Sequence, residues 1–324
     1  MNRISIAMCT YNGEKYLHEQ LVSIAQQTRL PDELVICDDG SSDSTPELVA
    51  RFTQSVSFPV RWIRNEKNLG STKNFEQAIS LCTGDLIALC DQDDIWLPEK
   101  LACQAEMLEG DRDLGGVFSD AQLITGKSQR RNTRLWASFL FTRSKQKKFR
   151  AGQAASILLS GNVVTGATLM IRASLRSSCL PIPPLWVHDG WIAWMIVLYS
   201  KLGAIDTPLI QYRIHDSQQI GIDGASYARL PLKQRFEAAA REEAAKHLAF
   251  AEALGELQQR ACEIGKLSEI SAIEGKILFL KQRGSSYNNR LHHLFHILCN
   301  VRHYQKYERS LKDLLRDAAI VVLT

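Results

Sequence analysis

Short apolar runs alternate with amphipathic stretches through the first 125 residues of the chain. Four of these runs have the length and composition of β-strands: 4–9, 33–37, 60–64 and 86–90. Between them, Leu17, Leu21 and Ile24 follow the i, i+4, i+7 spacing of a helix face, and 72–82 is a second helical stretch that ends before Gly84. This alternation predicts an α/β domain with a mainly parallel, Rossmann-like sheet flanked by helices.

Proline and capping residues predict where three helices begin. Thr45 followed by Pro46 is typical of an N-cap and a first-turn proline. Pro98 predicts a helix start after the fourth apolar run, because a first-turn proline loses no intrahelical hydrogen bond. A further apolar helix is predicted at 191–198, and Asp189 stands just before it, where a carboxylate can cap a helix.

The C-terminal third has a different composition. Residues 231–324 are rich in Ala, Leu, Glu and Lys, which favours helices. They contain 15 Lys or Arg against 11 Asp or Glu, a surplus of four that equals the net charge of +4 of the whole chain. We therefore expect an α/β domain over 1–220 and a helical extension over 221–324.

Carboxylates gather at the end of the fourth apolar run. Asp91, Asp93 and Asp94 lie within four residues and repel one another unless a cation lies among them. The two preceding strand ends that we expect to lie beside them carry Thr10 with Asn12 and Asp38 with Asp39. Ligands of parallel α/β sheets bind at the C-terminal ends of the strands. The pattern therefore favours a divalent-metal and phosphate site over an acidic turn that only caps a helix.

The cysteines and the apolar runs favour a cytoplasmic protein. Eight cysteines are scattered singly, without a Cys-x-x-Cys pair, which fits neither a zinc site nor a disulfide framework. The first core strand is expected to begin at Ile4, which leaves no room for a signal peptide. The longest apolar run, 191–199, is about half the length that a membrane span requires.

Residues 127–150 contain nine Lys or Arg and no Asp or Glu. One interpretation is a solvated loop or an exposed helix. The other is an arm that meets an anionic surface, either phospholipid or a lipid-linked phosphate. Nucleic acid is disfavoured, because no recognition motif accompanies the charge.

Five motifs in order resemble those of family 2 glycosyltransferases, over roughly the first 220 residues. They are Thr10-Tyr11-Asn12-Gly13, Asp38-Asp39-Gly40-Ser41, Asp91-Gln92-Asp93-Asp94, Gly161 to Thr168, and His188-Asp189-Gly190-Trp191. The likeness ends near Gln211 to His215. It implies the GT-A fold and an inverting enzyme that uses a nucleotide-sugar donor. The stretch around Asp91 most resembles bacterial rhamnosyltransferase-like members that build surface polysaccharides.

The resemblance implies a role for each strand end in holding a UDP- or dTDP-sugar. The residues assigned to the nucleotide are Thr10, Tyr11, Asn12, Asp39 and Asp91. Asp39 would accept a hydrogen bond from the base N3–H, the loop from Thr10 to Asn12 would pack around the base, and Asp91 would hold the ribose. Lys73 lies where the family often has a basic residue, so it is either a diphosphate contact or a surface lysine.

Asp93 would ligate Mg²⁺ or Mn²⁺ that bridges the donor diphosphate. Some GT-A enzymes supply a second metal ligand from a C-terminal histidine, which makes His215 a candidate. A structural role for His215 is the alternative, and Arg213 offers a different diphosphate contact, since guanidinium matches phosphate geometry.

Asp189 is the candidate general base, because inversion by a single displacement requires one carboxylate to take the proton of the acceptor hydroxyl. His188 stands where many members have Glu, so its role stays open between tuning the base and orienting the acceptor. Trp186 and Trp191 flank the base and either stack on a sugar face or belong to the core.

The sequence thus predicts a metal-dependent, inverting glycosyltransferase that acts on a glycan or a lipid-linked glycan. Two alternatives remain. A nucleotidyltransferase would carry a Gly-rich basic loop after the first strand, and 10–13 is not such a loop. A non-catalytic nucleotide-sugar binding module would not need Asp91, Asp93 and Asp189 intact.

Overall fold

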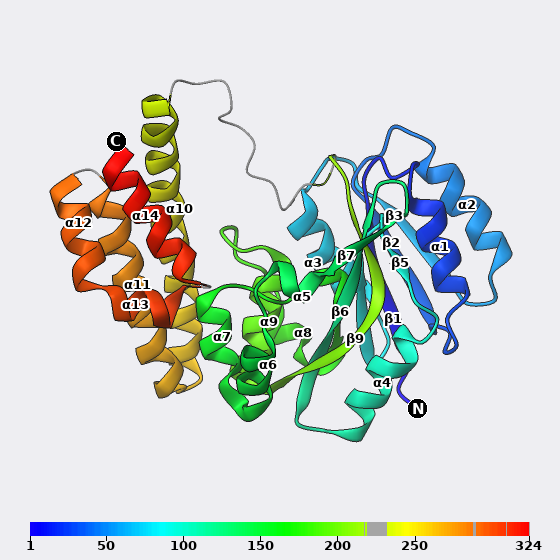
Figure 1. The fold of residues 1–324 in the computed structure, drawn as a ribbon. Coiled ribbons are helices and arrows are strands. Elements are labelled where there is room, and N and C mark those ends of the chain that lie inside the picture. The colour runs from blue at the N-terminus through cyan, green and yellow to red at the C-terminus, as the bar shows by residue number, and fades with distance from the viewer. Residues whose placement is uncertain (217, 219–231, 288–289, 309, 324) are drawn as a thin grey trace. The chain divides into compact units, whose positions relative to one another are not determined.

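A computed structural model describes residues 1–216, 218, 232–287, 290–308 and 310–323 (Figure 1). The chain divides into two compact units. The first contains 1–152 and 163–219, and the second contains 153–162 and 220–324. The predicted boundary at residue 220 lies outside the described residues, so the division into domains stays a prediction. The short segment 153–162, which belongs to the second unit, had no separate assignment from the sequence.

The first half of the N-terminal unit alternates strands and helices as predicted. Its elements are β1 Ile4–Thr10, α1 Leu17–Ala25, β2 Glu33–Asp38, α2 Thr45–Ser55, β3 Val60–Arg64, α3 Ser71–Leu81, β4 Leu86–Cys90, β5 Ile95–Trp96 and α4 Lys100–Gly110.

The second half is less regular. Its strands are β6 Leu114–Thr125, β7 Arg130–Arg134, β8 Leu169–Arg172 and β9 Lys201–Ile214. Its helices are α5 Leu135–Ser138, α6 Arg143–Lys148, α8 Arg176–Cys179 and α9 His188–Tyr199, with short π or 3₁₀ turns at Phe149–Gln153, Gly166–Thr168 and Ala173–Leu175.

All of these strands belong to one sheet, in the order β3-β2-β1-β4-β8-β6-β9-β5, with β7 paired to β6. The first four strands are mutually parallel. β8 is antiparallel to both β4 and β6, while β6 and β9 run parallel. The register aligns Thr10 with Asp38 and Met8 with Cys90. The C-terminal ends of β1, β2 and β4 therefore meet at one edge of the sheet.

Both faces of the sheet are covered. Side chains of α1, α2 and α4, such as Leu21, Val49 and Leu101, share one buried cluster with Ile6 and Met8 of β1. Helices α3 and α9 contact each other, and their buried residues lie outside that cluster. Helices therefore flank the sheet on two sides, which is the mixed, mainly parallel α/β architecture expected from the sequence.

The C-terminal unit is helical, as predicted. Its elements are α7 Ala154–Ser160, α10 Leu232–Glu263, α11 Leu267–Ser286, α12 Arg290–Cys299, α13 Val301–Tyr307 and α14 Leu311–Leu323. A buried ion pair links α11 to α14, because Arg283 Nε lies 2.7 Å from Asp317 Oδ2. Tyr287 donates a 2.7 Å hydrogen bond to the same carboxylate. Within the described ranges, no helix combines the length and the apolar character that crossing a membrane demands.

Three predicted helix starts are wrong by one to three residues. Thr45 is the first helical residue rather than the cap, which is Ser44, because the Thr45 hydroxyl accepts a hydrogen bond from Gly13 N–H instead. The helix after Pro98 begins at Lys100. Asp189 lies inside the first turn of α9 rather than before it.

Candidate active site

The ends of β1 and β2 are joined by the Asp38 carboxylate, which is fully buried. It accepts hydrogen bonds from the Thr10 hydroxyl at 2.8 Å, the Ser41 hydroxyl at 2.6 Å and Ser41 N–H at 2.8 Å. These bonds satisfy a charge that burial would otherwise penalise. Asp38 and the Thr10 side chain therefore shape the loops and are not available as ligand contacts.

The loop after β1 is held against the acidic loop after β4. Asn12 has a positive φ of 47°, and its side-chain oxygen accepts a hydrogen bond from Ser42 N–H. Gln92 forms two hydrogen bonds with the Tyr11 backbone, accepting from N–H at 2.8 Å and donating to C=O at 3.0 Å. The Tyr11 ring is 46% exposed, which leaves it accessible to a nucleotide base. The structure thus brings the loop at 10–13 beside Asp91 and Asp93.

The Asp39 carboxylate organises the turn after β3. Its Oδ1 accepts from Asn65 Nδ2 at 2.9 Å and from Leu69 N–H at 2.7 Å, while its Oδ2 accepts from Gly70 N–H at 2.9 Å. A carboxylate oxygen has two lone pairs, so Oδ2 has a second acceptor position. That position can receive the N3–H of a pyrimidine base.

Like charges crowd the loop after β4. The pKa of Asp91 is raised to about 8, because the surrounding protein desolvates its carboxyl group and because Asp93 and Asp189 are close enough to repel its charge. Asp189 belongs to the first turn of α9, so its repulsion of Asp91 shows that the start of α9 lies close to the end of β4. The three aspartates predicted to act together are therefore neighbours in space. A nearby cation would relieve this repulsion.

Asp94 and Arg213 hold the acidic loop against β9 through hydrogen bonds. Asp94 is fully buried, and its Oδ1 accepts a 2.9 Å hydrogen bond from Arg213 N–H. Burial and the charges of Asp93 and Asp91 hold the pKa of Asp94 well above its usual range. Lys100 is buried nearby, over the Trp96 ring at 3.8 Å, and desolvation lowers its pKa to about 7. Asp94 is therefore a structural member of the cluster.

Each of the three side-chain nitrogens of Arg213 donates a hydrogen bond within the protein. Its Nε donates to Asp93 C=O at 2.6 Å, and its two terminal nitrogens donate to Ser128 Oγ and Glu19 Oε2, each at 2.8 Å. The side chain is 1% exposed. A diphosphate contact, the alternative that the sequence offered, would require these bonds to break. Arg213 instead positions the backbone that carries Asp93.

His215 meets Asp93 directly. Its Nε2 lies 2.8 Å from Asp93 Oδ2, and both side chains are slightly exposed. Tyr16 packs against the imidazole, with the ring centroids 4.7 Å apart. Arg213, two positions before His215, also bonds to the acidic loop, through its N–H to Asp94 and its Nε to Asp93 C=O. The C-terminal end of β9 and the acidic loop are therefore held together here.

The residues present fit a divalent cation that shares its coordination with a ligand. Carboxylate oxygen and neutral imidazole nitrogen are both ligands of Mn²⁺, and carboxylate oxygen is the ligand that Mg²⁺ prefers. Across the residues that the structure describes, no group of three His, Cys, Asp or Glu side chains could hold a metal ion without other ligands. Asp93 and His215 supply two protein ligands, and phosphate oxygens would have to supply others.

Asp189 is half-buried in the first turn of α9. The backbone N–H groups of that turn have no intrahelical acceptors, and the helix dipole favours a negative charge there. The helix terminus therefore favours a charged carboxylate at this position, beside Asp91. This location suits a group that takes a proton from a substrate hydroxyl.

The aromatic residues around Asp189 are buried. Trp191 is 2% exposed and its indole N–H donates to Cys179 C=O at 2.8 Å, while Trp186 is 8% exposed. These positions favour the core-packing alternative over stacking on a sugar. His188 is 5% exposed and stacks on Phe75, with ring centroids 4.1 Å apart.

Gly166 makes room for His188. A Cβ atom on Gly166 would lie only 2.5 Å from His188 Nε2, so any other residue would displace the imidazole. Within the described part of the chain, neither ring nitrogen of His188 has a hydrogen-bond partner. Burial lowers the pKa of His188 to about 3, which keeps the ring neutral. Gly166 therefore leaves the space that the histidine before the candidate base occupies.

Replacing His188 with Phe should reduce the acid sensitivity of the fold. The unfolded chain takes up a proton near pH 6.5, whereas the folded chain does so only near pH 3, so this stability contribution is present above pH 6.5 and is lost as the pH falls. Between pH 7.5 and 4.5 the wild type should lose about 2–3 kcal/mol at this position, and His188→Phe should not. Urea unfolding at both pH values measures the difference.

Exposed His18 provides the control for this comparison. His18→Gln should keep the pH dependence of the wild type. An unchanged slope in His188→Phe would show that position 188 does not couple folding to pH.

Lys73 is engaged away from the acidic loop. Its Nζ lies 2.8 Å from Glu76 Oε2 and donates to Ile182 C=O at 2.8 Å. Glu76 also accepts a hydrogen bond from Ile182 N–H. Lys73 and Glu76 thus tie α3 to the segment before α9, which favours a structural role over a diphosphate contact.

Sequence reasoning missed three residues that build this site. Gln92 connects two loops, Glu19 pairs with Arg213, and Lys100 lies buried beside Asp94. A lysine or glutamine of this kind looks like a surface residue in a sequence. Only Gln92 could have been recognised as a site residue from the sequence, because it stands between Asp91 and Asp93.

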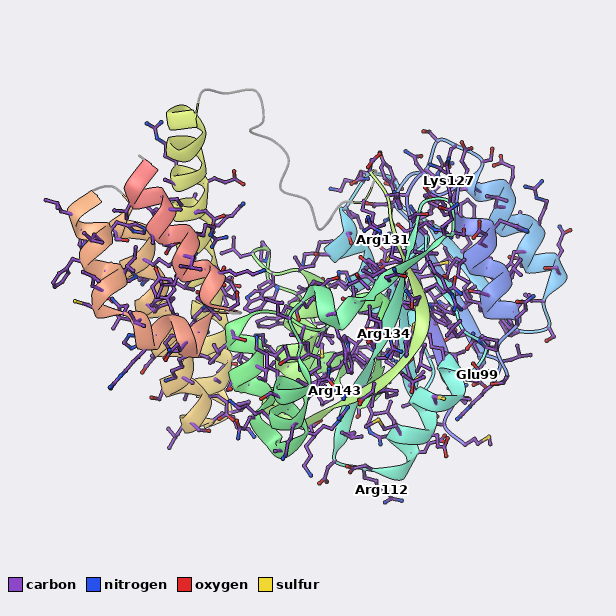
Figure 2. All side chains as sticks on the ribbon, in the orientation of Figure 1. Glu99, Arg112, Lys127, Arg131, Arg134 and Arg143 are labelled. Carbon is purple, nitrogen blue, oxygen red and sulfur yellow. The ribbon has the colours of Figure 1, made fainter. Side chains whose placement is uncertain are left out.

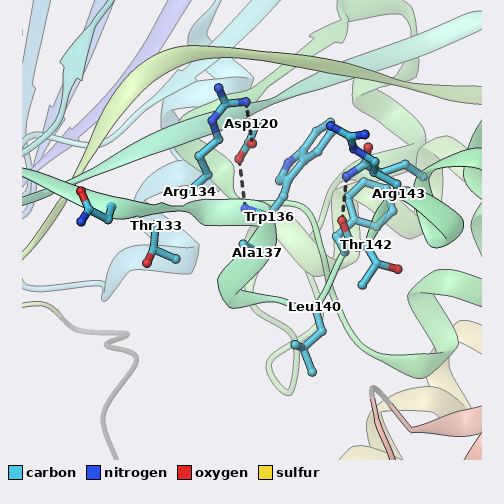
Figure 3. Close-up of a pocket in the computed structure, with 11 residues that line it drawn as sticks. Asp120, Thr133, Arg134, Trp136, Ala137, Leu140, Thr142 and Arg143 are labelled. Carbon is cyan, nitrogen blue, oxygen red and sulfur yellow. Dashed lines mark hydrogen bonds and ion pairs between the residues drawn. The ribbon is translucent and has the colours of Figure 1, made fainter.

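An open pocket of about 660 Å³ lies beside β7 and α5 (Figure 3). Asp120 lies at its base and accepts hydrogen bonds through Oδ1 from Ala121 N–H at 2.8 Å and Trp136 N–H at 3.0 Å. Asp120 Oδ2 lies 4.0 Å from Arg134. The indole N–H of Trp136 has no partner among the described residues. Asp120 and Trp136 are thus polar lining residues of the pocket that are themselves largely buried.

This pocket is distinct from the acidic cluster. In the β6–β9 ladder, Asp120 pairs with Pro208, whereas Thr125 pairs with Ile214 beside His215. The residues that line the pocket do not include Asp91, Asp93, Asp94 or Asp189.

The basic stretch 127–150 is ordered structure rather than an irregular loop. It forms β7, α5 and α6, and all five residues of β7 are exposed. Figure 2 shows Lys127, Arg131, Arg134 and Arg143 spread along this region of the N-terminal unit. Two of its basic residues have acidic partners, since Arg150 pairs with Asp206 and Arg134 lies near Asp120.

A mixed sheet of this order, with acidic residues at the ends of its parallel strands, defines a GT-A fold. Residues 5–176 match the family model "Glycosyl transferase family 2". The chain belongs to that family, as its motifs indicated. The rhamnosyltransferase-like subtype is a finer assignment than this match supports.

Three curated relatives match parts of this chain. An uncharacterized glycosyltransferase of Nostoc sp. is 28% identical over 220 residues, covering 66% of this chain and 65% of the relative. The abequosyltransferase RfbV of Salmonella typhimurium is 34% identical over 113 residues, 34% of each chain. WfgD of Escherichia coli, named as a UDP-Glc:alpha-D-GlcNAc-diphosphoundecaprenol beta-1,3-glucosyltransferase, is 35% identical over 125 residues, 39% of this chain and 48% of WfgD. The matches thus span less than two thirds of these three relatives.

Solved structures resemble the whole chain in fold. TarS 1-349 of S. aureus, crystallised with UDP-GlcNAc, has a TM-score of 0.56 and 17% identity, covering 99% of this chain and 90% of TarS 1-349. The mannosyltransferase PcManGT of Pyrobaculum calidifontis, in complex with GDP-Man and Mn²⁺, has a TM-score of 0.51 and 16% identity, covering 99% and 86%. Because both likenesses cover nearly the whole chain, they support a GT-A fold that is followed by a C-terminal helical region.

Proposed function

We propose that the chain is an inverting glycosyltransferase that moves a sugar from a UDP- or dTDP-sugar to a hydroxyl of a glycan or lipid-linked glycan. The observation that carries this proposal is the meeting of Asp91, Asp93 and Asp189 at one edge of the sheet, with His215 Nε2 2.8 Å from Asp93 Oδ2. Family membership and relatives that are named as glycosyltransferases support it.

Each side chain has one task in the proposed reaction. Asp39 binds the base, Tyr11 flanks it, and Asp91 holds the ribose hydroxyls. Asp93 and His215 would hold Mg²⁺ or Mn²⁺, which supplies positive charge to the leaving diphosphate. The PcManGT complex with Mn²⁺ supports this choice of ion. Asp189 takes the proton of the attacking hydroxyl, from a half-buried position in the first turn of α9.

The proposed acceptor is a bacterial surface glycan under construction. The name of the WfgD relative includes a diphosphoundecaprenol-linked sugar, and RfbV is an abequosyltransferase. We propose that the pocket at Asp120 binds a part of the acceptor away from the reacting hydroxyl, and that the exposed arginines of β7 face its phosphates or anionic lipid. A peripheral position at the cytoplasmic face of the membrane follows from this assignment. For the donor sugar we propose a deoxyhexose, because the stretch around Asp91 resembles rhamnosyltransferase-like members.

A nucleotidyltransferase is a weaker candidate. The loop 10–13 is held by side chains of Gln92, Ser41 and Thr45 and does not form a Gly-rich cradle of free N–H groups. A binding module without catalysis would leave unexplained a carboxylate at position 189 beside Asp91.

Asp39→Ala should weaken binding of UDP and dTDP alike, by about tenfold to a hundredfold, because both bases present the same N3–H to a charged acceptor. Calorimetry with each nucleotide in the presence of Mn²⁺ measures the loss. Screening nucleoside-diphosphate sugars by thermal stabilisation identifies the donor in the same experiment.

Asn65→Ala serves as the matched control. It removes one hydrogen bond to Asp39 but leaves the carboxylate in place, so affinity should change by a few-fold at most. If Asp39→Ala binds both nucleotides as the wild type does, the base lies elsewhere and the donor assignment is wrong.

A further inference from the structure

Helix α12 turns its largest apolar side chains toward solvent. Leu291, Leu294, Phe295 and Leu298 are 78%, 42%, 66% and 67% exposed. Their i, i+3, i+4, i+7 spacing places them along one face of the helix. We call these four residues the α12 stripe. A single exposed leucine is ordinary, but a continuous apolar face marks an interaction surface.

The opposite face of α12 is buried and contains two histidines beside Ile297. His293 and His296 are 2% and 4% exposed. Ser286 Oγ lies 2.6 Å from His293 Nδ1, and Asn300 Nδ2 lies 3.1 Å from His296 Nδ1. An ordinary surface helix buries its apolar face and exposes its polar one. The packing of α12 on α11 and α14 therefore does not account for the stripe.

The sequence on either side of the stripe is basic. Residues 275–307 contain six Lys or Arg and no Asp or Glu. Two of the six, Lys276 and Arg283, are buried and paired with Glu308 and Asp317, so they serve the interior of the unit. Lys281, Arg302 and Lys306 are exposed. The surface that accompanies the stripe is therefore basic.

We infer that the α12 stripe lies in the interface of an anionic phospholipid membrane. Helices with an apolar face and basic flanks bind at the boundary between headgroups and acyl chains, and anionic lipid strengthens that binding. The stripe supplies the apolar contact, and Arg302 and Lys306 supply attraction to the headgroups. This inference goes beyond the proposed sugar transfer and does not depend on it.

A second copy of the chain is a less suitable partner. Two copies that met symmetrically through the stripe would also bring the basic residues of 275–307 together, and that range contains no carboxylate to pair with them. Helix α14, which contacts α12, carries Asp313, but Arg316 already lies 3.5 Å from that carboxylate. Anionic lipid satisfies both the apolar face and the charge.

Vesicle sedimentation with the full chain tests the inference. The wild type should bind vesicles of phosphatidylglycerol and phosphatidylcholine more tightly than vesicles of phosphatidylcholine alone. Phe295→Gln combined with Leu298→Gln should weaken binding to the anionic vesicles at least about tenfold, because the apolar contribution scales with the area that is buried. Leu267→Gln is the matched control, since Leu267 is a lone leucine that is 79% exposed at the start of α11.

A second variant separates the stripe from the basic stretch of the N-terminal unit. Neutralising Arg130, Arg131, Lys147 and Lys148 together should reduce the salt-sensitive part of binding and leave the effect of the stripe substitutions in place. An environment-sensitive fluorophore on exposed Cys299, with the other exposed cysteine replaced in Cys262→Ser, should shift to the blue on addition of anionic vesicles.

Three results would overturn the inference. The first is unchanged vesicle binding in the Phe295→Gln, Leu298→Gln variant. The second is vesicle binding without a fluorescence change at Cys299. The third is a wild-type dimer in light scattering that the stripe substitutions abolish while vesicle binding stays unchanged, which would assign the stripe to a second copy. Glycosyl transfer to a water-soluble acceptor should be the same in wild type and variant.

Discussion

Asp189→Asn should abolish most sugar transfer while leaving nucleotide binding near normal. An amide keeps the shape of the side chain but cannot take the proton of the acceptor hydroxyl, and the loss of a general base costs roughly 10²–10⁴ in rate. Asp189 stands beside Asp91, so the removal of its charge should also ease the repulsion that raises the pKa of Asp91. Nucleotide affinity should therefore stay the same or rise slightly. Calorimetry for binding and a transfer assay for rate measure the two effects separately.

The position of Asp189 requires a control for helix stability. A carboxylate in the first turn of a helix contributes about 0.3–1 kcal/mol through the helix dipole, and Asp189→Asn loses this term. Glu47 occupies the first turn of α2 and is exposed, so Glu47→Gln should lose a similar amount of stability with full activity. Turnover at the wild-type rate in Asp189→Asn would move the base to another residue. Loss of folding in that variant alone would make Asp189 structural.

The parallel half of the sheet could be predicted from the sequence because each signal there is local. The runs at 60–64 and 86–90 match β3 and β4 in their bounds, and β1 and β2 extend the predicted strands by one residue. Apolar strands buried on both faces and separated by turn residues show themselves in single-sequence patterns. The meeting of three strand ends then follows from parallel topology alone.

The antiparallel half depends on contacts that no local pattern reveals. β8 is inserted between β4 and β6, and β9 pairs with β6 over a stretch that contains register shifts. β7 comes from a basic segment with little apolar character and is a strand because it pairs with β6. Tertiary pairing here overrides the propensity of the segment.

The residues of the candidate site also divide into those with a local sequence signal and those without one. The positions of Asp39, Asp91, Asp93 and Asp189 at strand and helix ends could be predicted, because carboxylates there stand out in the sequence, and their roles stay predictions. The buried state of Trp191 could not, since an indole fits a sugar site and a core equally well. Arg213 was visible only as a basic residue, and its role in holding the acidic loop follows from bonds to residues as distant as Glu19.

Chelation of divalent ions should abolish turnover, and Asp93→Ala should weaken nucleoside diphosphate binding in the presence of Mn²⁺. Asp93 and His215 are the two side chains that contact each other at the site, and neither can hold a diphosphate by attraction, since one is an anion and the other is uncharged when it binds a metal. We expect a loss of at least the roughly 10–100-fold that removal of a residue supporting a metal ligand costs. His215→Ala should weaken binding less than Asp93→Ala, because it leaves the carboxylate ligand.

The double variant Asp93→Ala, His215→Ala decides whether the two residues hold one ion. If they do, the losses in Mn²⁺ affinity, measured by electron paramagnetic resonance, should not add, because residues that share one partner are coupled. Asp113→Asn, an exposed carboxylate whose partner is Lys201, should bind Mn²⁺ and nucleotide as the wild type does. Additive losses would place the histidine outside the metal site, as a structural partner of Asp93. Full activity in chelator would remove the metal from the mechanism and leave the diphosphate to be neutralised by groups other than Asp93 and His215.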